Sequence, residues 1–254
     1  MRLCALGSGS RGNATLIDSG NTRLLIDCGF AARELEERAQ QADFCLTELD
    51  AILVTHEHGD HIRGVGAVSR RYQVPVFSTH GSLRSGKCGK LTQNQTISPH
   101  AENFSIGDIE VQPVAVPHDA AEPCQFIFKA ANKRLGILTD LGCITPLIKQ
   151  AYQQLDMLLL ECNHDTQMLH DGPYPPALQR RVGGDYGHLN NQQAMTLLEQ
   201  MDLPALQQLV IGHLSEKNNH PEKVMQAVEE RVVALIDRYE ILQQDEISNW
   251  FEIT

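Results

Sequence analysis

Three histidines and one aspartate fall within six positions of the chain, in residues 55–61, whose sequence is THEHGDH. Neutral imidazoles and carboxylates are the usual protein ligands of zinc, and they also suit manganese and iron. Neighbouring ligands that face different metals can hold two ions about 3.5–4 Å apart. The spacing lets His56 and His58 reach one ion while Asp60 and His61 reach the other. We expect Gly59 to give the backbone freedom for the bend between the two pairs.

The elements around this segment place it on a loop between a strand and a helix. An apolar run, Ala51–Val54, precedes it and predicts a buried strand, and the residues from His61 to about Tyr72 can form a helix. Loops that join such elements present functional groups on a rigid scaffold. A polar loop could be rich in histidine by chance, but four ligand-type residues at this spacing favour a metal site.

Three more ligand-type residues each follow a predicted strand: His118 after residues 109–116, Asp140 after 134–138 and His213 after 209–212. An isolated histidine would normally be discounted, and Asp140 could instead cap the helix that begins near Thr145. The residues by themselves leave both interpretations open.

Another histidine, His188, precedes Asn190, which can cap a helix running to about Met201. The N-terminus of a helix favours an anion. A histidine at such a place can bind phosphate or protonate a leaving oxygen. Arg180 and Arg181 lie close by in sequence and could hold further phosphates.

Length and composition predict one domain spanning residues 1–254, with 42% hydrophobic residues for its core. No apolar stretch approaches the ~20 residues of a membrane helix, so we expect no membrane association. The first residues predict a strand rather than a signal peptide. Seven cysteines without a Cys-x-x-Cys spacing favour reduced thiols and a cytoplasmic location.

The formal net charge of -11 disfavours a long non-specific footprint on nucleic acid, which normally uses clusters of lysine and arginine. A nucleic-acid substrate remains compatible with this charge, because two divalent ions would add positive charge at the site.

The pattern His-x-His-x-Asp-His after an apolar strand resembles the signature of the metallo-β-lactamase superfamily. The resemblance implies an α/β fold of four αββα layers, with two divalent ions, zinc or manganese with iron possible, at one edge of the two sheets. It also implies the full ligand set: His56, His58 and His118 on one ion, Asp60, His61 and His213 on the other, and Asp140 as the bridge.

The glycine-rich loop at residues 7–13 lies near the metal site in this superfamily. The resemblance therefore implies that Ser8, Ser10 and Asn13 line the substrate groove. Ordinary turn chemistry is the alternative explanation of the same residues.

Residues 187–190 resemble a segment of ribonuclease Z whose histidine contacts the scissile phosphate. Residues 7–13, 161–165, 174–188 and 213–221 resemble single-domain exonucleases of the YycJ and WalJ type. This resemblance implies a 5′-to-3′ DNA exonuclease that serves DNA repair. It also implies a mechanism in which a metal-bridging hydroxide attacks phosphorus, with Asp60 and His188 as catalytic residues.

Other functions are compatible with the same ligands. One is hydrolysis of a small phosphodiester or thioester, which the acidic composition favours slightly, and another is ribonuclease activity. A regulatory metal protein that has lost turnover is a third, although the intact ligand set argues against it. The sequence leaves open the native metal and the oligomeric state.

Overall fold

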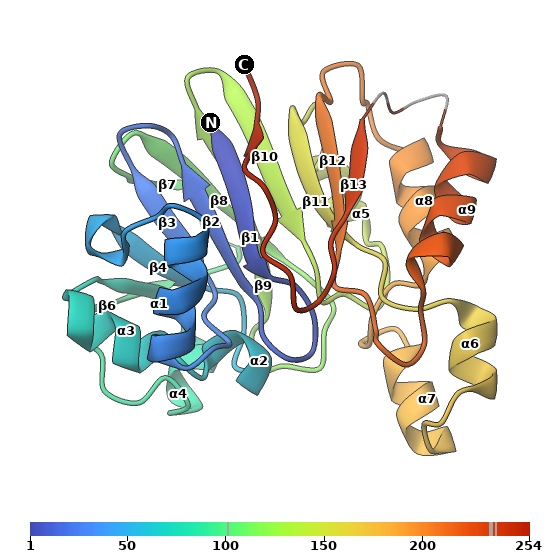
Figure 1. Cartoon of the computed structure of the whole chain (residues 1–254), viewed down its shortest axis with the longest axis horizontal. Coiled ribbons are helices and arrows are strands. Elements are labelled where there is room, and N and C mark those ends of the chain that lie inside the picture. Colours follow the sequence, from blue (N-terminus) through green and yellow to red (C-terminus); the bar gives the residue numbers. More distant parts are fainter. Residues whose placement is uncertain (101, 234–235, 237) are drawn as a thin grey trace.

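Two seven-stranded sheets form the centre of the computed structural model, which describes residues 1–100, 102–233, 236 and 238–254 (Figure 1). The first sheet has the strand order β14 (Phe251–Glu252), β1 (Arg2–Gly7), β2 (Ala14–Asp18), β3 (Arg23–Ile26), β4 (Ala51–Val54), β5 (Val76–Thr79) and β6 (Asn94–Ile97). The second has the order β13 (Tyr239–Ile241), β12 (Gln208–Gly212), β11 (Met157–Glu161), β10 (Lys133–Leu138), β9 (Cys124–Ala130), β8 (Ile109–Ala115) and β7 (Phe104–Ile106).

Parallel strands occupy one part of each sheet. Strands β3 to β6 are mutually parallel in the first sheet, and β10 to β13 are mutually parallel in the second. Strands β4 and β11 are buried along their whole length, as expected for continuous apolar runs with both faces covered. Ligands of such sheets bind beyond the carboxyl ends of the strands.

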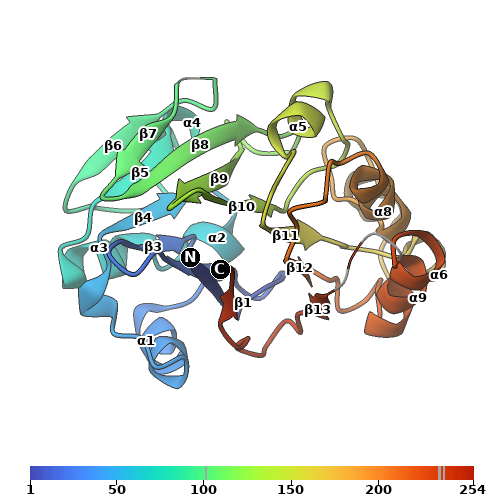
Figure 2. The same cartoon turned by 90° about the horizontal axis from the view of Figure 1, so that it is seen from above.

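Helices cover the outer faces of both sheets (Figure 2). The first sheet is covered by α1 (Ala32–Gln41), α3 (Val65–Tyr72) and the short η1 (Leu46–Glu48), and the second by α5 (Pro146–Ala151), α8 (Asn191–Glu199) and α9 (Pro221–Arg231). A separate apolar cluster fills the space between the sheets. The predicted four-layer αββα fold is therefore confirmed. Within the described part of the chain, no helix has the length and low polarity that crossing a membrane requires.

Three short helices lie at the same end of the sandwich (Figure 1): α2 (Gly59–Ile62), α6 (Thr166–Asp171) and α7 (Pro176–Val182). Another short helix, α4 (His80–Arg84), directly follows β5. Because the THEHGDH segment runs from the end of β4 into α2, this end of the sandwich is where the predicted ligands meet.

Some predicted elements differ from the structure. The helix expected from His61 to Tyr72 is two helices, because the chain turns at Gly64, where an added Cβ would lie 1.9 Å from the carbonyl oxygen of Phe30. The sequence of residues 221–238 predicts one amphipathic helix. In the structure this helix ends at Arg231, and residues 234, 235 and 237 lie outside the described part of the chain.

The sequence of residues 239–242 and 250–253 predicts two strands that pair as a terminal hairpin, and this pairing is wrong. Strand β13 runs parallel to β12 in the second sheet, whereas β14 runs antiparallel to β1 in the first. The acidic segment between these strands crosses from one sheet to the other, so the two strands do not pair. A local pattern predicts that a segment is extended, but it does not predict which sheet the segment joins.

Candidate metal centre

The structure brings all seven predicted ligand residues to one edge of the two sheets. Each follows the end of a strand: β4 precedes His56, His58, Asp60 and His61, while β8, β10 and β12 precede His118, Asp140 and His213. Their ligand atoms form overlapping groups in which all atoms lie within 4.8 Å of one another: His56 with His58 and His118, His56 with His61 and Asp140, and Asp60 with His61 and His213. Two neighbouring ions could be held by such overlapping groups.

The three-histidine group consists of His56, His58 and His118. Nδ1 of His118 donates to the carbonyl oxygen of Gly187 at 3.0 Å, and Nε2 of His58 donates to that of Asp119 at 3.2 Å. The other nitrogens of these two rings, Nε2 of His118 and Nδ1 of His58, lie 3.3 Å apart. Each outer hydrogen bond fixes the tautomer, so that a lone pair faces the centre of the group.

His56 completes this group through a hydroxyl contact. Its Nδ1 lies 2.9 Å from Oγ1 of Thr55, and that hydroxyl donates to Asp27 at 2.7 Å. The hydroxyl therefore accepts from Nδ1–H of His56, which leaves Nε2 as the ring nitrogen with a lone pair.

The aspartate–histidine group consists of Asp60, His61 and His213. Carboxylates hold both of its rings: Nδ1 of His61 donates to Asp27 at 2.7 Å, and Nδ1 of His213 donates to Glu161 at 2.9 Å. Nε2 of His61 lies 3.5 Å from Oδ2 of Asp60. The free nitrogens again face inward, as metal ligands do.

Asp140 stands between the two groups. Its Oδ2 lies 3.4 Å from Nε2 of His61, and its Oδ1 lies 3.5 Å from Nε2 of His213 and 3.8 Å from Nε2 of His118. Burial alone would raise the pKa of this carboxyl, but the surrounding imidazoles lower it below its ordinary value. The position and charge suit a carboxylate that is shared by two cations.

Two buried atoms at this centre test whether the residues fit metal ions. Nε2 of His56 and Oδ2 of Asp140 have no hydrogen-bond partner among the described residues. Unpaired buried polar atoms are costly, and they are rare unless a water or an ion satisfies them. Both atoms belong to the overlapping ligand groups, so the donor set fits divalent cations.

Three residues at this edge have a left-handed backbone. Asp27, Asp140 and His213 have φ values of 60°, 55° and 56°, and each stands just beyond the end of a strand. Residues other than glycine are strained in this conformation, and such strain is concentrated at functional sites. Gly59 shows no positive φ and has no close neighbour where its side chain would be, so the prediction that its freedom makes the bend is wrong.

Burial acts to lower the pKa of both His56 and His61, but the groups around the two rings shift their pKa values in opposite directions. In His56, neighbouring imidazoles add to burial, and the pKa lies well below its ordinary value. In His61, Asp140, Asp60 and Asp27 outweigh burial and raise the pKa well above its ordinary value. The two groups therefore differ in electrostatic environment.

Glu161 organises one side of the centre, although the sequence analysis gave it no role. It is fully buried at the end of β11. Its Oε2 accepts from His188, His213 and the backbone N–H of Asp140, and its Oε1 accepts from the N–H groups of Leu141 and Leu189. Both oxygens already accept hydrogen bonds, which suits a carboxylate that orients the predicted ligands, although a carboxylate oxygen of Glu161 also lies within 4.8 Å of ligand atoms of Asp140, His188 and His213. A carboxylate that ends an apolar strand was the signal available for it.

Asp27 supports His61 in the way that Glu161 supports His213. It follows β3, and its carboxylate accepts from the backbone N–H of Thr55 at 2.8 Å as well as from His61 and the Thr55 hydroxyl. The sequence did not predict a role for Asp27 either, although this residue follows the apolar run of a strand in the same way as Asp140.

His188 lies where the sequence predicts, before a helix. Asn190 caps α8 and forms a capping box with Gln193. Nδ1 of His188 donates to Glu161 at 3.0 Å, and its side chain is 20% exposed. Burial would lower the pKa of His188, but Glu161 and other carboxylates raise it to about 9. Because Nδ1 is bonded to Glu161, Nε2 remains for a substrate.

Gly187 connects His188 to the three-histidine group. An added Cβ at this glycine would lie 2.1 Å from the carbonyl oxygen of Val182, so no larger residue fits without movement. This close packing sets the Gly187 carbonyl against Nδ1 of His118. The end of α7 therefore helps to orient a predicted metal ligand.

The central hollow, of about 100 Å³, opens above these ligands and is lined by Ser10, Asp60, Asn163, Tyr174, Val182, His188, His213, Leu214 and Ser215. Tyr174 comes from the segment between α6 and α7. The hollow thus joins the predicted ligand residues to a wall made by the end of α7 and the chain that precedes this helix.

The glycine-rich loop residues have three different places. Ser10 lines the central hollow. Ser8 is buried, and its hydroxyl accepts from the backbone N–H of His213 at 2.8 Å, so it supports a ligand rather than lining a groove. Nδ2 of Asn13 lies 3.0 Å from Nε2 of His61 and 3.3 Å from Oδ2 of Asp60, which places this amide against the ligands themselves.

The two arginines expected to hold phosphates lie on α7, which buries none of its residues. The guanidinium of Arg181 pairs with the carboxylate of Asp119, next to His118. Arg180 is exposed. Arg181 therefore ties α7 to the loop of a predicted ligand, while Arg180 is accessible to solvent.

Comparisons with known proteins agree with this geometry. Residues 22–214 match the family described as the beta-lactamase superfamily domain. The chain is 32% identical over 252 residues to the exodeoxyribonuclease YycJ of Bacillus anthracis, an alignment that covers 96% of each protein. It is 32% identical over 222 residues to the exodeoxyribonuclease WalJ of Streptococcus pneumoniae, covering 85% of this chain and 82% of that protein.

Solved structures show the same fold. The metallo-β-lactamase fold protein YhfI from Bacillus subtilis superposes with a TM-score of 0.71 at 15% identity, covering 98% of this chain and 99% of that one. The short form of human tRNase Z superposes with a TM-score of 0.67 at 14% identity, with the same coverage.

The chain therefore belongs to the beta-lactamase superfamily, as a hydrolase with the metallo-β-lactamase fold, which implies divalent metal ions. Within the superfamily it groups with the exodeoxyribonucleases YycJ and WalJ, so the family resemblance predicted from the sequence is confirmed.

Proposed function

We propose that the chain is a 5′-to-3′ exodeoxyribonuclease that uses two divalent ions. One observation carries the proposal: seven ligand-type side chains meet below a small hollow, in a chain similar over nearly its whole length to a protein named as an exodeoxyribonuclease. The bound ions would be zinc or manganese, since both accept imidazole and carboxylate ligands. They would supply a nucleophilic hydroxide near neutral pH and would neutralise charge on the phosphoryl oxygens.

The residues of the chain have distinct roles in the proposed reaction. In the proposal His56, His58 and His118 hold one ion, Asp60, His61 and His213 hold the other, and Asp140 bridges. Hydrolysis of a phosphodiester adds hydroxyl to phosphorus and requires a proton on the leaving oxygen. His188 is placed to supply that proton from Nε2, because Glu161 fixes its Nδ1 and the ring lines the central hollow. Asp60 also lines this hollow and can orient the attacking group.

The first experiment tests the substrate. Manganese-loaded protein is incubated with end-labelled double-stranded DNA, single-stranded DNA and RNA, beside an Asp60→Ala control. We expect stepwise loss from the 5′ end of DNA, abolished in the control. Cleavage of RNA alone would move the function to a ribonuclease, and turnover of only a small chromogenic diester would move it to a small-molecule phosphodiesterase or related hydrolase.

The second experiment tests the role of His188. His188→Ala should lower DNA turnover about 10²–10⁴-fold, the usual contribution of a general acid, while the metal content stays unchanged. Metal analysis of the purified variant is the control. Loss of bound metal in this variant would assign His188 to the ligands instead of to proton transfer.

We also propose that residues 1–254 act as one domain and that the protein works in the cytoplasm. All seven cysteine thiols are free, four of the seven predicted ligands come from the first sheet and three from the second, and the central hollow draws on both sheets. Free thiols are typical of reducing compartments. DNA repair is the pathway that we expect for such an exonuclease.

A further inference from the structure

A second cavity, the side hollow, adjoins the central hollow. It has a volume of about 350 Å³, and both hollows are lined by Leu214 and Ser215. The consecutive residues Ser10 and Arg11 line one hollow each. The two spaces are therefore neighbours.

Their sizes suit different parts of a nucleotide. Sites for small organic ligands usually measure about 300–1,000 Å³. The central hollow, of about 100 Å³, is well below this range and suits a phosphate group next to the metal ligands. The side hollow lies within the range and can take a nucleobase with its sugar.

The lining of the side hollow is balanced in charge. Two cations and two carboxylates meet here: Arg11, Lys217 and Glu216 line the hollow, and Arg11 pairs with Glu216 at 2.5 Å and with Asp245 at 2.6 Å. Leu242 and Pro221 add apolar surface. A neutral, partly apolar lining favours a nucleoside over a second phosphate, because a nucleoside has an apolar ring face and carries no charge.

Gln244 lines the side hollow, and hydrogen bonds fix its amide. Oε1 of Gln244 accepts from the hydroxyl of Ser10 at 3.0 Å and from the backbone N–H of Arg11 at 3.2 Å, which sets the orientation of the amide. Nε2 of the same amide is closed to solvent and has no hydrogen-bond partner among the described residues. A buried donor without a partner is costly, so an acceptor on a base or sugar that displaced the atoms covering it would offset this cost.

We propose that the side hollow binds the terminal nucleoside of a DNA strand while the adjacent scissile phosphate lies in the central hollow. The proposal rests on the proposed exonuclease function, and it assigns a specificity site to residues that lie outside the metal ligands. A terminal nucleoside at this place would set the register in which each phosphodiester reaches the ions.

The test fills the side hollow without touching a ligand. Gln243 lines it and is exposed, and among the described residues its side chain bonds only to Glu246, so Gln243→Trp should occupy the space. In manganese-loaded protein we expect the Kd for deoxythymidine monophosphate, measured by calorimetry, and the KM for DNA to rise at least about 10-fold. Metal content should not change.

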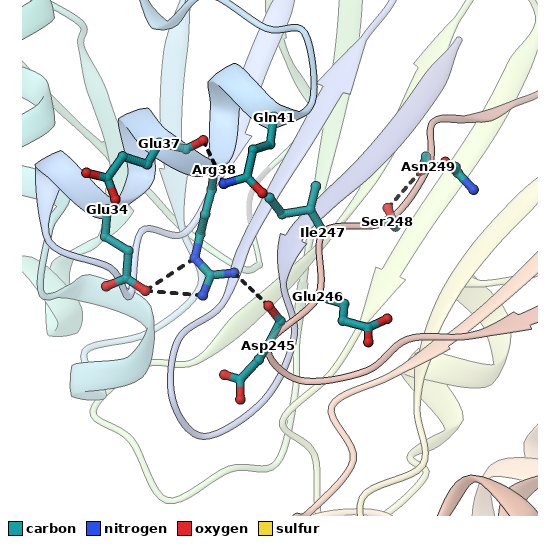
Figure 3. A pocket seen from close by; sticks show the side chains of 9 residues that line it. All are labelled: Glu34, Glu37, Arg38, Gln41, Asp245, Glu246, Ile247, Ser248 and Asn249. Atoms are coloured by element: carbon teal, nitrogen blue, oxygen red, sulfur yellow. Dashed lines mark hydrogen bonds and ion pairs between the residues drawn. The ribbon is translucent and has the colours of Figure 1, made fainter.

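A matched variant controls for the bulky substitution. Gln41 lines a different pocket, of about 660 Å³, between α1 and residues 245–249, where Arg38 bonds Glu34 and the backbone oxygen of Asp245 (Figure 3). This pocket shares no lining residue with the central hollow. Gln41→Trp should therefore leave both nucleotide binding and DNA cleavage at the wild-type level.

The outcomes separate the two proposals. Unchanged Kd and KM in Gln243→Trp, with normal metal content, would overturn the terminal-nucleoside site. An equal loss in Gln41→Trp would overturn it as well. Wild-type protein that binds the mononucleotide through Gln243 but cleaves no DNA would overturn the exonuclease function and retain the nucleoside site.

Discussion

The two halves of the metal centre are supported by different chemistry. In the three-histidine group, the outer nitrogens of His58 and His118 donate to backbone carbonyls, and His56 donates to a hydroxyl. In the aspartate–histidine group, His61 and His213 each donate to a buried carboxylate. Similar imidazoles thus receive neutral partners on one side and charged partners on the other.

This difference predicts unequal affinities for the two ions. A carboxylate behind an imidazole raises the basicity of the ring and fixes its orientation more strongly than a carbonyl does. The aspartate–histidine group should therefore bind its ion more tightly, and the three-histidine group should exchange its ion more readily. Substitutions of the supporting residues test whether the two groups differ in their affinity for metal ions.

Glu161→Gln should have the largest effect. The amide keeps the volume, but it presents an N–H₂ group to rings and backbone groups that need an acceptor. Because Glu161 supports both His188 and His213, we expect DNA turnover to fall about 100-fold or more, with loss of one ion per chain. Elemental analysis and turnover measure this, with circular dichroism as the folding control. Two bound ions at full turnover would contradict it.

Asp27→Asn should have the second largest effect. It removes the carboxylate behind His61 but leaves Glu161 and His213 in place. We expect the affinity for one ion to fall about 10- to 100-fold, as for other residues that orient metal ligands. A titration of metal-free protein with manganese would show it as a second, weaker binding phase. Equal weakening of both ions would show that the halves are not independent.

Thr55→Val should have a smaller effect. The change removes the hydroxyl that accepts from His56 and donates to Asp27, at nearly constant volume. Since the lost acceptor is neutral, we expect turnover to fall less than about 10-fold, the lower limit of the usual range. Steady-state kinetics at saturating manganese measures it. A loss as large as that in Asp27→Asn would remove the distinction between neutral and charged support.

Asp18→Asn tests a carboxylate away from the centre and should have the smallest effect. Burial of Asp18 would raise its pKa, but hydrogen bonds from Arg2 and Gly20 lower it overall. A lowered pKa stabilises the folded state above the unfolded pKa, and this stabilisation is lost as pH falls through the folded pKa. We expect the variant to be about 1 kcal/mol less stable at pH 7.

Urea unfolding at pH 7 and near pH 3 measures this difference. The gap between wild type and Asp18→Asn should narrow at the lower pH, while metal content and turnover at pH 7 stay the same. A gap that is constant with pH would show that the carboxylate charge does not contribute to stability. A change in metal content would show that Asp18 influences the centre.

The sequence was informative where chemistry and local pattern coincide. His56, His58, Asp60 and His61 follow an apolar strand within a few residues, so both their types and their place could be predicted. Glu161 also ends an apolar strand, but its role depends on partners at five other positions that only the fold brings together. Contacts between distant segments carry no local signal.

The same reason explains why the sequence did not predict the contact of Arg181 or the sheets that β13 and β14 join. The pairing of Arg181 with Asp119 joins segments 62 residues apart, so a basic pair that suggested phosphate binding is partly committed to a protein contact. Strands β13 and β14 were recognised as extended, but their membership of different sheets depends on which strand edges remain open after the rest of the chain has folded.

The left-handed residues of the centre have an evolutionary consequence. A strained backbone at a non-glycine residue costs on the order of 1–3 kcal/mol, although aspartate tolerates the left-handed region better than most residues. Asp27, Asp140 and His213 are positions where glycine would relieve the backbone strain but would remove a predicted ligand or its support. Thermal robustness and activity are therefore opposed at the same three positions, so a more stable lineage must gain its stability elsewhere in the fold.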